Sequence, residues 1–439
     1  MSDQAYVDHV LTIQHRWESA LEVAGFGAAI VTAGEPAPYF LDDQTPVFRN
    51  NPHLAQWFPD DDCELSALLV RPGKPPRLYF YQPADYWHLP PATPDWVAEA
   101  LDVQLYDDAA KLEAAILADS EKINRVAHVG EHAFSNLPTE NTNPALLLNH
   151  LHYHRAYKTP WEIACMTRAT EQAVQGHLAA RDVFFTGGSE FDINLAYLAA
   201  SQQTSAELPY SSIIALNEHA GVLHYQHYDR TPPEQHRSLL IDAGGRDHSY
   251  ASDITRTYSA VAGSLFSELL TALDEAQQSL ISEIRPGPNY LDLHKQFHER
   301  LASILGDLNI WRCTAASAFE RGMTNSFLPH GLGHLIGLQT HDVAGLQSSA
   351  EGGMNPPPEQ YPALRLTRPV EVGQVFTIEP GVYFIPALLQ ALRKSSQGAD
   401  VNWQTVDVLR PCGGIRIEDN VLVTEDGAIN LTRNAFLNA

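Results

Sequence analysis

The segment Phe327-Leu-Pro-His-Gly-Leu-Gly-His-Leu-Ile-Gly337 is the most distinctive stretch of this 439-residue chain. It places His330 and His334 four residues apart, and His341 follows seven residues later. The segment differs from the zinc-protease helix, because glycine and not glutamate follows the first histidine. Glycine lets the backbone approach a metal or a ligand closely. A single histidine is more often a packed core residue, but three histidines in a glycine-spaced segment indicate a site.

Four other motifs each contribute one carboxylate to a set with His334. In chain order they are Ile241-Asp-Ala-Gly-Gly245, Ser252-Asp-Ile-Thr-Arg-Thr257, Thr377-Ile-Glu-Pro-Gly381 and Gly413-Gly-Ile-Arg-Ile-Glu-Asp419, which supply Asp242, Asp253, Glu379 and Glu418. Four carboxylates and one imidazole suit two hard divalent cations, such as manganese, in one site. A paired-metal site of this kind activates water for hydrolysis. Because no acid follows the first histidine, Glu379 is the candidate general base.

Asp242 and Asp253 are expected to face each other across a hairpin. Strand-like segments flank a polar turn, and a turn centred between Asp247 and His248 would place the two aspartates directly opposite. Opposed carboxylates repel, and a cation between them would turn this repulsion into binding. Two unrelated loop acids explain the same residues, and the hairpin alone favours that alternative.

Glu379 and Glu418 are each ambiguous on local evidence. Strand alternation places Arg416 and Glu418 on one face, but an exposed strand edge explains such a pair equally well. Glu379 ends an apolar strand just before Pro-Gly, where a carboxylate can simply mark a turn. The metal-site hypothesis therefore depends on the five residues occurring together.

Composition limits the class of protein. The chain has 53 acidic residues against 28 Lys and Arg, a net charge of −25, which would repel nucleic acid and anionic lipid surfaces. No apolar run approaches the roughly 20 residues of a transmembrane helix, and the N-terminus does not resemble a signal peptide. The four cysteines have no paired spacing, so we expect free thiols and a cytoplasmic location. Neither a nucleic-acid partner nor a membrane is expected.

Length and pattern predict two domains with mixed α/β architecture. Residues 1–157 form an αβ unit without evident chemistry, and residues 158–439 carry all the motifs above. A long helix is expected from Thr159 to about Phe184, because Thr159 can cap it and Pro160 and Glu162 suit its first turn. The other predicted elements are helices at 6–24, 96–101, 109–117, 146–157, 190–203, 265–285 and 290–306, and strands at 28–32, 67–71, 77–82, 126–130, 239–242 and 254–258.

The ordered candidate ligands, with the His-Gly-Leu-Gly-His and Gly-Gly-Ile-Arg-Ile-Glu-Asp sequences, resemble the dimetal pita-bread peptidases. This family includes prolidase, aminopeptidase P and methionine aminopeptidase. Four weaker matches are similar to its bacterial Xaa-Pro dipeptidase branch, which is close to the organophosphorus acid anhydrolases: Phe40-Leu-Asp-Asp43, 153–158, 215–218 and 223–225. The resemblance covers nearly the whole chain. It implies a creatinase-like N-terminal αβ domain followed by a pita-bread catalytic domain.

The resemblance implies a role for each candidate ligand of two divalent ions, expected to be Mn²⁺. Asp242 would hold one ion, and His334 and Glu379 would hold the other. Asp253 and Glu418 would bridge the two ions. Glu379 would also accept a proton during hydrolysis.

A second set of residues is implied to surround the substrate. Arg368 would clamp the terminal carboxylate, a task suited to a guanidinium, and Arg416 would steady the metal ligands. Asp43 lies on a loop that would reach the partner's site in a homodimer. The remaining members contact the substrate, contact the developing oxyanion or line the pocket: His224, His341, His330 and Tyr210.

The implied activity is metal-dependent hydrolysis of Xaa-Pro dipeptides, with phosphotriesters or phosphofluoridates as side substrates. An Xaa-Pro bond lacks an N–H, so strand-like recognition of the substrate backbone loses a donor. A site that grips both ends of a dipeptide avoids this loss. The alternatives are an aminopeptidase P that acts on longer peptides, and a non-catalytic binding protein that has lost its metals.

Overall fold

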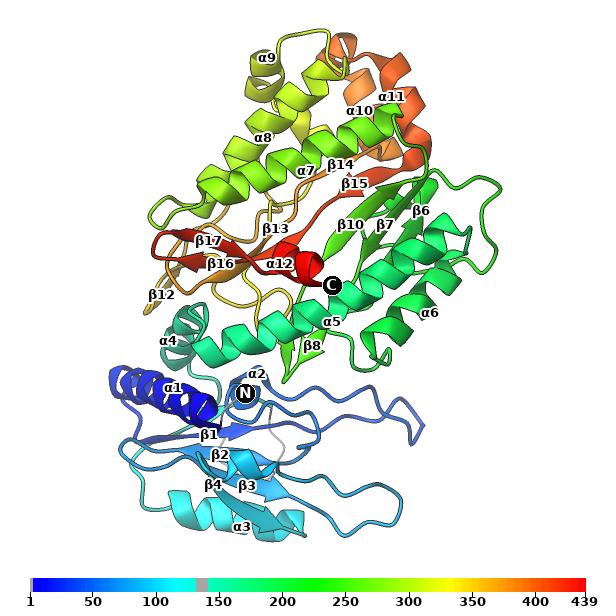
Figure 1. Ribbon diagram of the computed structural model, residues 1–439. Helices are drawn as coiled ribbons and strands as arrows, with labels where there is room; N and C mark the ends of the chain where they lie inside the picture. Colours follow the sequence, from blue (N-terminus) through cyan, green and yellow to red (C-terminus); the bar gives the residue numbers. More distant parts are fainter. Residues whose placement is uncertain (1–2, 132–140) are drawn as a thin grey trace. The chain divides into compact units, whose positions relative to one another are not determined.

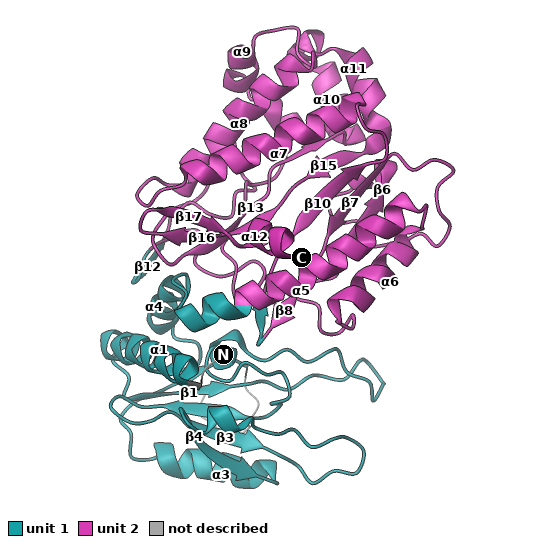
Figure 2. Cartoon of the chain, in the orientation of Figure 1, with its two compact units in different colours: residues 1–165, 248–250, 349–353 teal, residues 166–247, 251–348, 354–439 magenta. Residues whose placement is uncertain are grey.

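The computed structural model describes residues 3–131 and 141–439, which form two compact units (Figures 1 and 2). The first unit extends to Cys165 and includes residues 248–250 and 349–353, and the second comprises residues 166–247, 251–348 and 354–439. The sequence places the boundary at 157/158, whereas this division falls within a long helix. Both units combine helices with strands, which confirms the mixed α/β class.

The first unit is built on a five-stranded sheet of order β4-β3-β2-β1-β5. Its strands are β1 Ala28–Thr32, β2 Ala67–Val70, β3 Arg77–Tyr81, β4 Asp102–Tyr106 and β5 Val126–Val129. Its helices are α1 Asp3–Ala24, α2 Pro52–Ala55, α3 Ala109–Ser120 and α4 Ala145–Arg155. Side chains along β1 and β2 point alternately to the two faces of the sheet. On one face, Ala28, Ile30, Ala67 and Leu69 pack with Leu112 and Ile116 of α3.

The second unit carries the motifs found in the sequence. Its helices are α5 Pro160–Phe185, which begins in the first unit, α6 Glu190–Ser201, α7 Leu265–Glu283, α8 Tyr290–Asp307, α9 Ala315–Glu320, α10 Pro386–Lys394, α11 Trp403–Leu409 and α12 Leu431–Asn438. The remaining strands of the chain are β6 Ile213–Leu216, β7 Ser238–Asp242, β8 Arg246–Asp247, β9 Tyr250–Ala251, β10 Thr255–Ser259, β11 Gln347–Ser349, β12 Gly352–Met354, β13 Val375–Ile378, β14 Gly381–Tyr383, β15 Gly414–Arg416, β16 Asp419–Thr424 and β17 Gly427–Asn430.

Three small antiparallel sheets support the motifs of the second unit. Their strand orders are β10-β7-β6, β13-β16-β17 and β14-β15. Apolar residues of α5 and α6, including Phe184 and Ile193, pack against Ile214, Leu239 and Ile241 of β6 and β7. Helices α7 and α8 bond to the strand β13 and its extension, since Gln277 donates to the Ile378 carbonyl at 2.9 Å and Tyr290 to the Thr377 carbonyl at 2.6 Å.

Helix starts follow the expected chemistry. At α5 the Thr159 hydroxyl accepts from the Glu162 N–H at 3.3 Å, and the Glu162 carboxylate accepts from the Thr159 N–H at 2.7 Å, which confirms the predicted cap. Ser189 and Asp192 form the same reciprocal pair at α6.

The helix predicted at 96–101 is wrong: a 3-10 turn at Asp95–Val97 precedes β4, which pairs in parallel with β3. Strand pairing begins only at Asp102, and turns occupy residues 98–100 between the 3-10 helix and β4.

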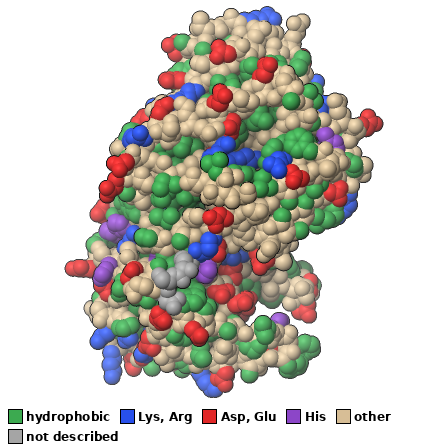
Figure 3. Space-filling model, in the orientation of Figure 1, with side chains coloured by type: hydrophobic (Ala, Val, Ile, Leu, Met, Phe, Trp, Pro, Cys, Tyr) green, Lys and Arg blue, Asp and Glu red, His purple; other side chains and the backbone are tan. Residues whose placement is uncertain are grey.

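On the face drawn in Figure 3, acidic side chains are spread widely, with basic and hydrophobic side chains between them. Of the helices in the described part of the chain, none is long and apolar enough to span a bilayer.

Candidate metal centre

Asp242 and Asp253 come together at the end of the β7–β10 pair. The strands pair with Asp242 opposite Thr255, so the prediction that Asp242 lies directly opposite Asp253 is wrong. His248 and Ser249 both have positive φ, of 46° and 66°, and therefore form the turn one residue later than predicted. The Tyr210 hydroxyl lies between the two aspartates, at 2.8 Å from Asp242 Oδ1 and 2.5 Å from Asp253 Oδ1.

His334 lies beside the strand β13. Its carbonyl accepts from the Thr377 N–H at 2.9 Å, and its own N–H donates to Thr377 Oγ1 at 3.2 Å. The preceding Gly333 is required here, because a Cβ atom would lie 2.0 Å from the Thr377 carbonyl oxygen. The imidazole Nδ1 lies 3.0 Å from the Leu335 carbonyl, which can only accept, so Nδ1 carries the proton. Nε2 therefore faces the carboxylates, and its lone pair can bind a cation once its proton is released.

Glu418 and Arg416 project from the β15–β16 segment toward the aspartates. The Glu418 N–H donates to the Thr255 carbonyl at 3.0 Å, and the Thr255 hydroxyl donates to Glu418 Oε2 at 2.8 Å. Arg416 donates through Nη2 to Asp242 Oδ2 at 2.6 Å and through Nη1 to the Tyr383 hydroxyl at 3.0 Å. Strand alternation therefore directs both residues to one cluster.

Three carboxylates lie close to the imidazole of His334. Its Nε2 lies 3.4 Å from Asp253 Oδ2, 3.8 Å from Glu418 Oε1 and 3.9 Å from Glu379 Oε1. Asp253, His334 and Glu418 each offer one ligand atom within 4.8 Å of the others, and all three are buried. Oxygen and imidazole ligands at these separations are suited to a divalent cation.

The charges of the cluster do not balance without a cation. Asp242, Asp253 and Glu418 are 8%, 5% and 2% exposed, and the guanidinium of Arg416 bonds Asp242 alone among them. Burial raises the pKa of Glu418 well above its ordinary value, and the neighbouring carboxylates Asp253 and Glu379 raise it further. Burial likewise raises the pKa of Glu379 to about 7. Bound cations would remove this excess of negative charge, so the residues fit a metal centre.

Asp253 behaves differently from its neighbours. Burial alone would raise its pKa, but the hydrogen bond and the charge of His334, together with the Tyr210 hydroxyl, lower the pKa overall. Burial would lower the pKa of His334, but the hydrogen bond to Asp253 and the charges of Glu379 and Asp253 raise it overall.

A cavity of about 180 Å³ opens onto these ligands. Burial lowers the pKa of His330 to about 3 and that of His341 to about 4, so both imidazoles are neutral at physiological pH. His330 Nε2 lies 2.8 Å from the Tyr383 hydroxyl. The cavity is lined by Leu223, His224, Asp242, Asp253, His330, Gly331, Gly333, His334, His341, Ala363, Arg365, Glu379, Arg416 and Glu418.

Neither Arg368 nor Tyr210, both predicted to be near the substrate, is among the residues that line this cavity. Arg368 is 1% exposed, contacts Glu371 at 3.3 Å and does not line the cavity, whereas the exposed Arg365 does. Both arginines lie in Arg365-Leu-Thr-Arg368, and nothing in that local sequence tells which one faces the cavity. Tyr210 bonds the metal ligands and is not among the residues lining the cavity. Asp43 is exposed and belongs to the first unit, so its role stays a prediction.

Comparison with known proteins gives consistent matches. Residues 164–425 match metallopeptidase family M24, and residues 4–153 match the family described as Xaa-Pro dipeptidase, N-terminal domain. The chain is 43% identical to Xaa-Pro dipeptidase 2 of Idiomarina loihiensis over 98% of each chain. It is 44% identical to the Xaa-Pro dipeptidase of Shewanella woodyi over 99% of this chain and 98% of that protein.

Solved structures share the fold. The aminopeptidase PepP of Pseudomonas aeruginosa superposes with a TM-score of 0.75 at 20% identity, covering 99% of this chain and 96% of that one. Escherichia coli aminopeptidase P with the inhibitor Pro-Leu gives a TM-score of 0.73 at 21% identity over the same shares.

The raised pKa of Glu379 makes a prediction for the stability of metal-free protein. Folded protein keeps the Glu379 proton up to about pH 7, whereas the unfolded chain releases it near the ordinary value of 4.5. The free energy of unfolding should therefore fall as pH rises through this window. Glu379→Gln cannot titrate, so its stability relative to the parent should increase with pH, by up to about 3 kcal/mol. Urea unfolding of both chelated proteins between pH 4.5 and 7.5 measures this difference. The exposed Glu320→Gln is the control, and identical pH slopes for all three would contradict the prediction.

Proposed function

This chain belongs to metallopeptidase family M24, and we infer that it is a metal-dependent dipeptidase that hydrolyses Xaa-Pro dipeptides. The observation that carries this inference is a cluster of three carboxylates within 3.9 Å of His334 Nε2, with Asp242 held beside Asp253 by the Tyr210 hydroxyl. The four carboxylates and His334 all line one cavity of about 180 Å³. Full-length relatives that are 43–44% identical bear the name Xaa-Pro dipeptidase. The aminopeptidase P structures share the fold at 20–21% identity, and this likeness does not indicate the substrate of the chain.

We propose that five residues hold two divalent ions. Asp242 would hold one ion, His334 and Glu379 the other, and Asp253 and Glu418 both. Two bound cations in such a site polarise a carbonyl and lower the pKa of a coordinated water. Mn²⁺ is our proposal for the metal, because oxygen-rich sites with one imidazole suit it.

The other residues of the site orient these ligands and handle protons. Arg416 and Tyr210 donate to the ligand carboxylates and so fix their positions. Glu379 is also the candidate proton acceptor: it can take a proton from the attacking water and return it to the leaving proline nitrogen. His224 and His341 line the cavity, where the neutral His341 imidazole can donate to a developing oxyanion.

We propose Arg365, in place of Arg368, as the group that binds the substrate's terminal carboxylate. Arg365 lines the cavity, and a guanidinium pairs with a carboxylate through two parallel hydrogen bonds. Arg368 is buried against Glu371. Recognition of a free carboxylate next to the scissile bond would explain a preference for dipeptides.

The first test is a substrate panel on chelated and Mn²⁺-loaded protein. Ala-Pro should be hydrolysed by the loaded protein only, and the tripeptide Ala-Pro-Ala should be a poor substrate. Asp253→Asn and Glu418→Gln should lower kcat for Ala-Pro at least about 100-fold and reduce the bound metal, because each removes a ligand. Tyr210→Phe leaves every proposed ligand in place, so its kcat for Ala-Pro should fall less. Preferred cleavage of the tripeptide would favour the aminopeptidase alternative, and a phosphofluoridate in the panel tests the proposed side activity on the same metals.

A second test separates the two arginines. Arg365→Gln should raise KM for Ala-Pro about 10–100-fold, since one charge-assisted contact is lost, and should leave KM for the Ala-Pro amide unchanged. Arg368→Lys is the control, and any change it causes should affect the acid and the amide alike. A selective loss of Ala-Pro binding in Arg368→Lys would mean that Arg368, and not Arg365, binds the substrate's carboxylate.

We further propose a cytoplasmic homodimer in which the loop Phe40–Asp43 caps the partner's site. Phe40 and Leu41 are 92% and 91% exposed, and large apolar side chains on a loop favour burial against another surface. Asp42 stabilises the turn by accepting from the Asp43 and Gln44 N–H groups.

Asp43→Ala tests this capping role. If the loop limits substrate length, the variant should cleave Ala-Pro-Ala faster relative to Ala-Pro, with its metal content unchanged. Sedimentation equilibrium of the parent should give a dimer. A fully active monomer, or unaltered selectivity in the variant, would mean that the loop is only a solvated turn before Pro46.

A further inference from the structure

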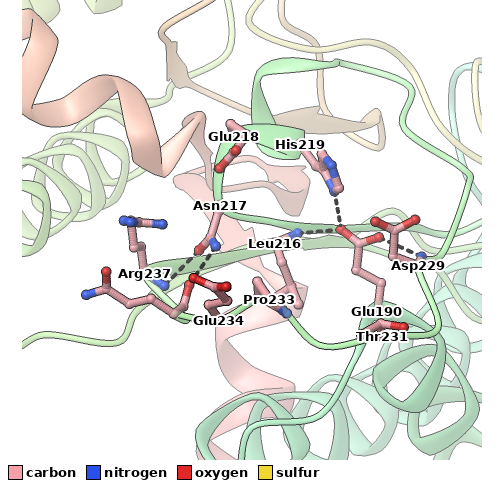
Figure 4. Close-up of a pocket in the computed structure, with 11 residues that line it drawn as sticks. Glu190, Leu216, Asn217, Glu218, His219, Asp229, Thr231, Pro233, Glu234 and Arg237 are labelled. Carbon is pink, nitrogen blue, oxygen red and sulfur yellow. Dashed lines mark hydrogen bonds and ion pairs between the residues drawn. The ribbon is translucent and has the colours of Figure 1, made fainter.

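A second cluster of the same unit centres on the carboxylate of Glu190, the first residue of α6. Glu190 is 1% exposed and accepts four hydrogen bonds. Oε1 accepts from the Leu216 N–H at 2.9 Å and from His219 Nδ1 at 2.7 Å. Oε2 accepts from the Tyr225 hydroxyl and from the Asp229 N–H, each at 2.8 Å. Figure 4 shows the bonds from Leu216, His219 and Asp229 converging on this carboxylate.

All four donors belong to one short segment, residues 216–229. The same segment carries Leu223 and His224, which line the metal cavity. One buried carboxylate thus contacts the segment before, within and after the part that faces the substrate. The rings of His219 and Tyr225 also stack on each other, with centroids 4.4 Å apart.

This segment has little regular structure of its own. After a 3-10 helix at Asn217–Gly221, it contains neither a helix nor a strand. Asn217 and Tyr228, near its two ends, both have positive φ, of 55° and 51°. Such conformations cost about 1–3 kcal/mol each in a non-glycine residue and persist only where the surroundings enforce them. The four bonds to Glu190 restrain the segment together with bonds that join the side chains of Asn217, Gln226 and Tyr228 to residues outside it.

Glu190 also borders a cavity of about 370 Å³, and with His219 and Asp229 it could in principle hold a cation. A carboxylate offers about four lone-pair positions. All four are occupied by donors from the segment, so this geometry is that of an anchor rather than of a metal ligand.

We propose that Glu190 is a positioning residue for the dipeptidase reaction: it holds segment 216–229 so that His224 faces the substrate. This inference rests on the proposed function, which places His224 in contact with the dipeptide. Glu190 itself does not line the metal cavity and acts through the segment.

Glu190→Gln is the sharpest change, because it preserves shape and replaces one acceptor oxygen by an NH₂ donor. The Tyr225 hydroxyl can rotate to accept from that amide, but a backbone N–H such as that of Asp229 cannot. One end of the segment should therefore be released. We expect kcat/KM for Ala-Pro to fall roughly 10–100-fold, as displaced catalytic or binding groups commonly cost, with the metal content unchanged. Tyr225→Phe, which removes one donor only, should show a smaller loss.

A double-mutant cycle with His224→Ala identifies the route of the effect. If Glu190 acts through His224, Glu190→Gln should cause little further loss of kcat/KM in the His224→Ala protein. Asp192→Asn is the matched control: it weakens the cap of the same helix without touching the segment, so it should lower stability and leave kcat/KM for Ala-Pro near the parent value. Fully additive losses from Glu190→Gln and His224→Ala would overturn the proposal.

Hydrogen exchange gives a readout that does not depend on activity. The amides of Leu216 and Asp229 should exchange faster in Glu190→Gln than in the parent, while amides of β7 keep their protection. Unchanged exchange at both amides would overturn the anchoring role. Failure of the loaded parent protein to hydrolyse Ala-Pro would instead overturn the proposed function, and the exchange result would still decide whether Glu190 holds the segment.

Discussion

The mutual repulsion of four carboxylates placed together away from water is the constraint on which the site depends. Asp242, Asp253 and Glu418 are almost fully buried, and Glu379 completes the group around His334. Hydroxyl donors and one guanidinium offset only part of the cost of burying these charges. Without a cation, the raised pKa values of Glu379 and Glu418 favour their protonated forms. A divalent metal replaces those protons and lets the carboxylates act as ligands.

Three threonines connect the strands that carry these ligands. Thr255 joins Glu418, Thr257 joins Arg416, and Thr377 joins His334, in each case through the side-chain hydroxyl. Threonine is favoured in strands because its branched side chain packs well on a pleated surface. Its hydroxyl then reaches the neighbouring segment without a change of backbone geometry. The metal ligands are therefore tied to one another by strand residues, which keeps the charged cluster rigid in spite of the short strands.

The ligands could be predicted from sequence because each occupies a compact motif and because their order matches a known pattern. The pairing partner of Asp242 could not be predicted from sequence. The reason is that His248 and Ser249 adopt a turn conformation that glycine or asparagine usually signals. Arg365 and Arg368 could not be told apart, because only the course of the loop decides which one is buried. Glu190 gave no local signal at all: its partners lie 26 to 39 residues away along the chain and meet it only in the folded protein.

The division between strand and loop explains how one fold serves related peptidases. The chain shares its fold with aminopeptidase P structures at 20–21% identity, and a shared fold alone does not specify a substrate. The residues proposed to hold metal lie on strands or directly beside them, where any shift would unbalance buried charge. His224, His341 and Arg365, which line the cavity and are proposed to face the substrate, lie outside regular helices and strands. Loops can change in length and sequence without moving the ligands, provided that something holds each loop in place. For the segment that carries His224, the buried carboxylate of Glu190 meets that requirement, because it takes its hydrogen bonds from the loop and none from the metal ligands.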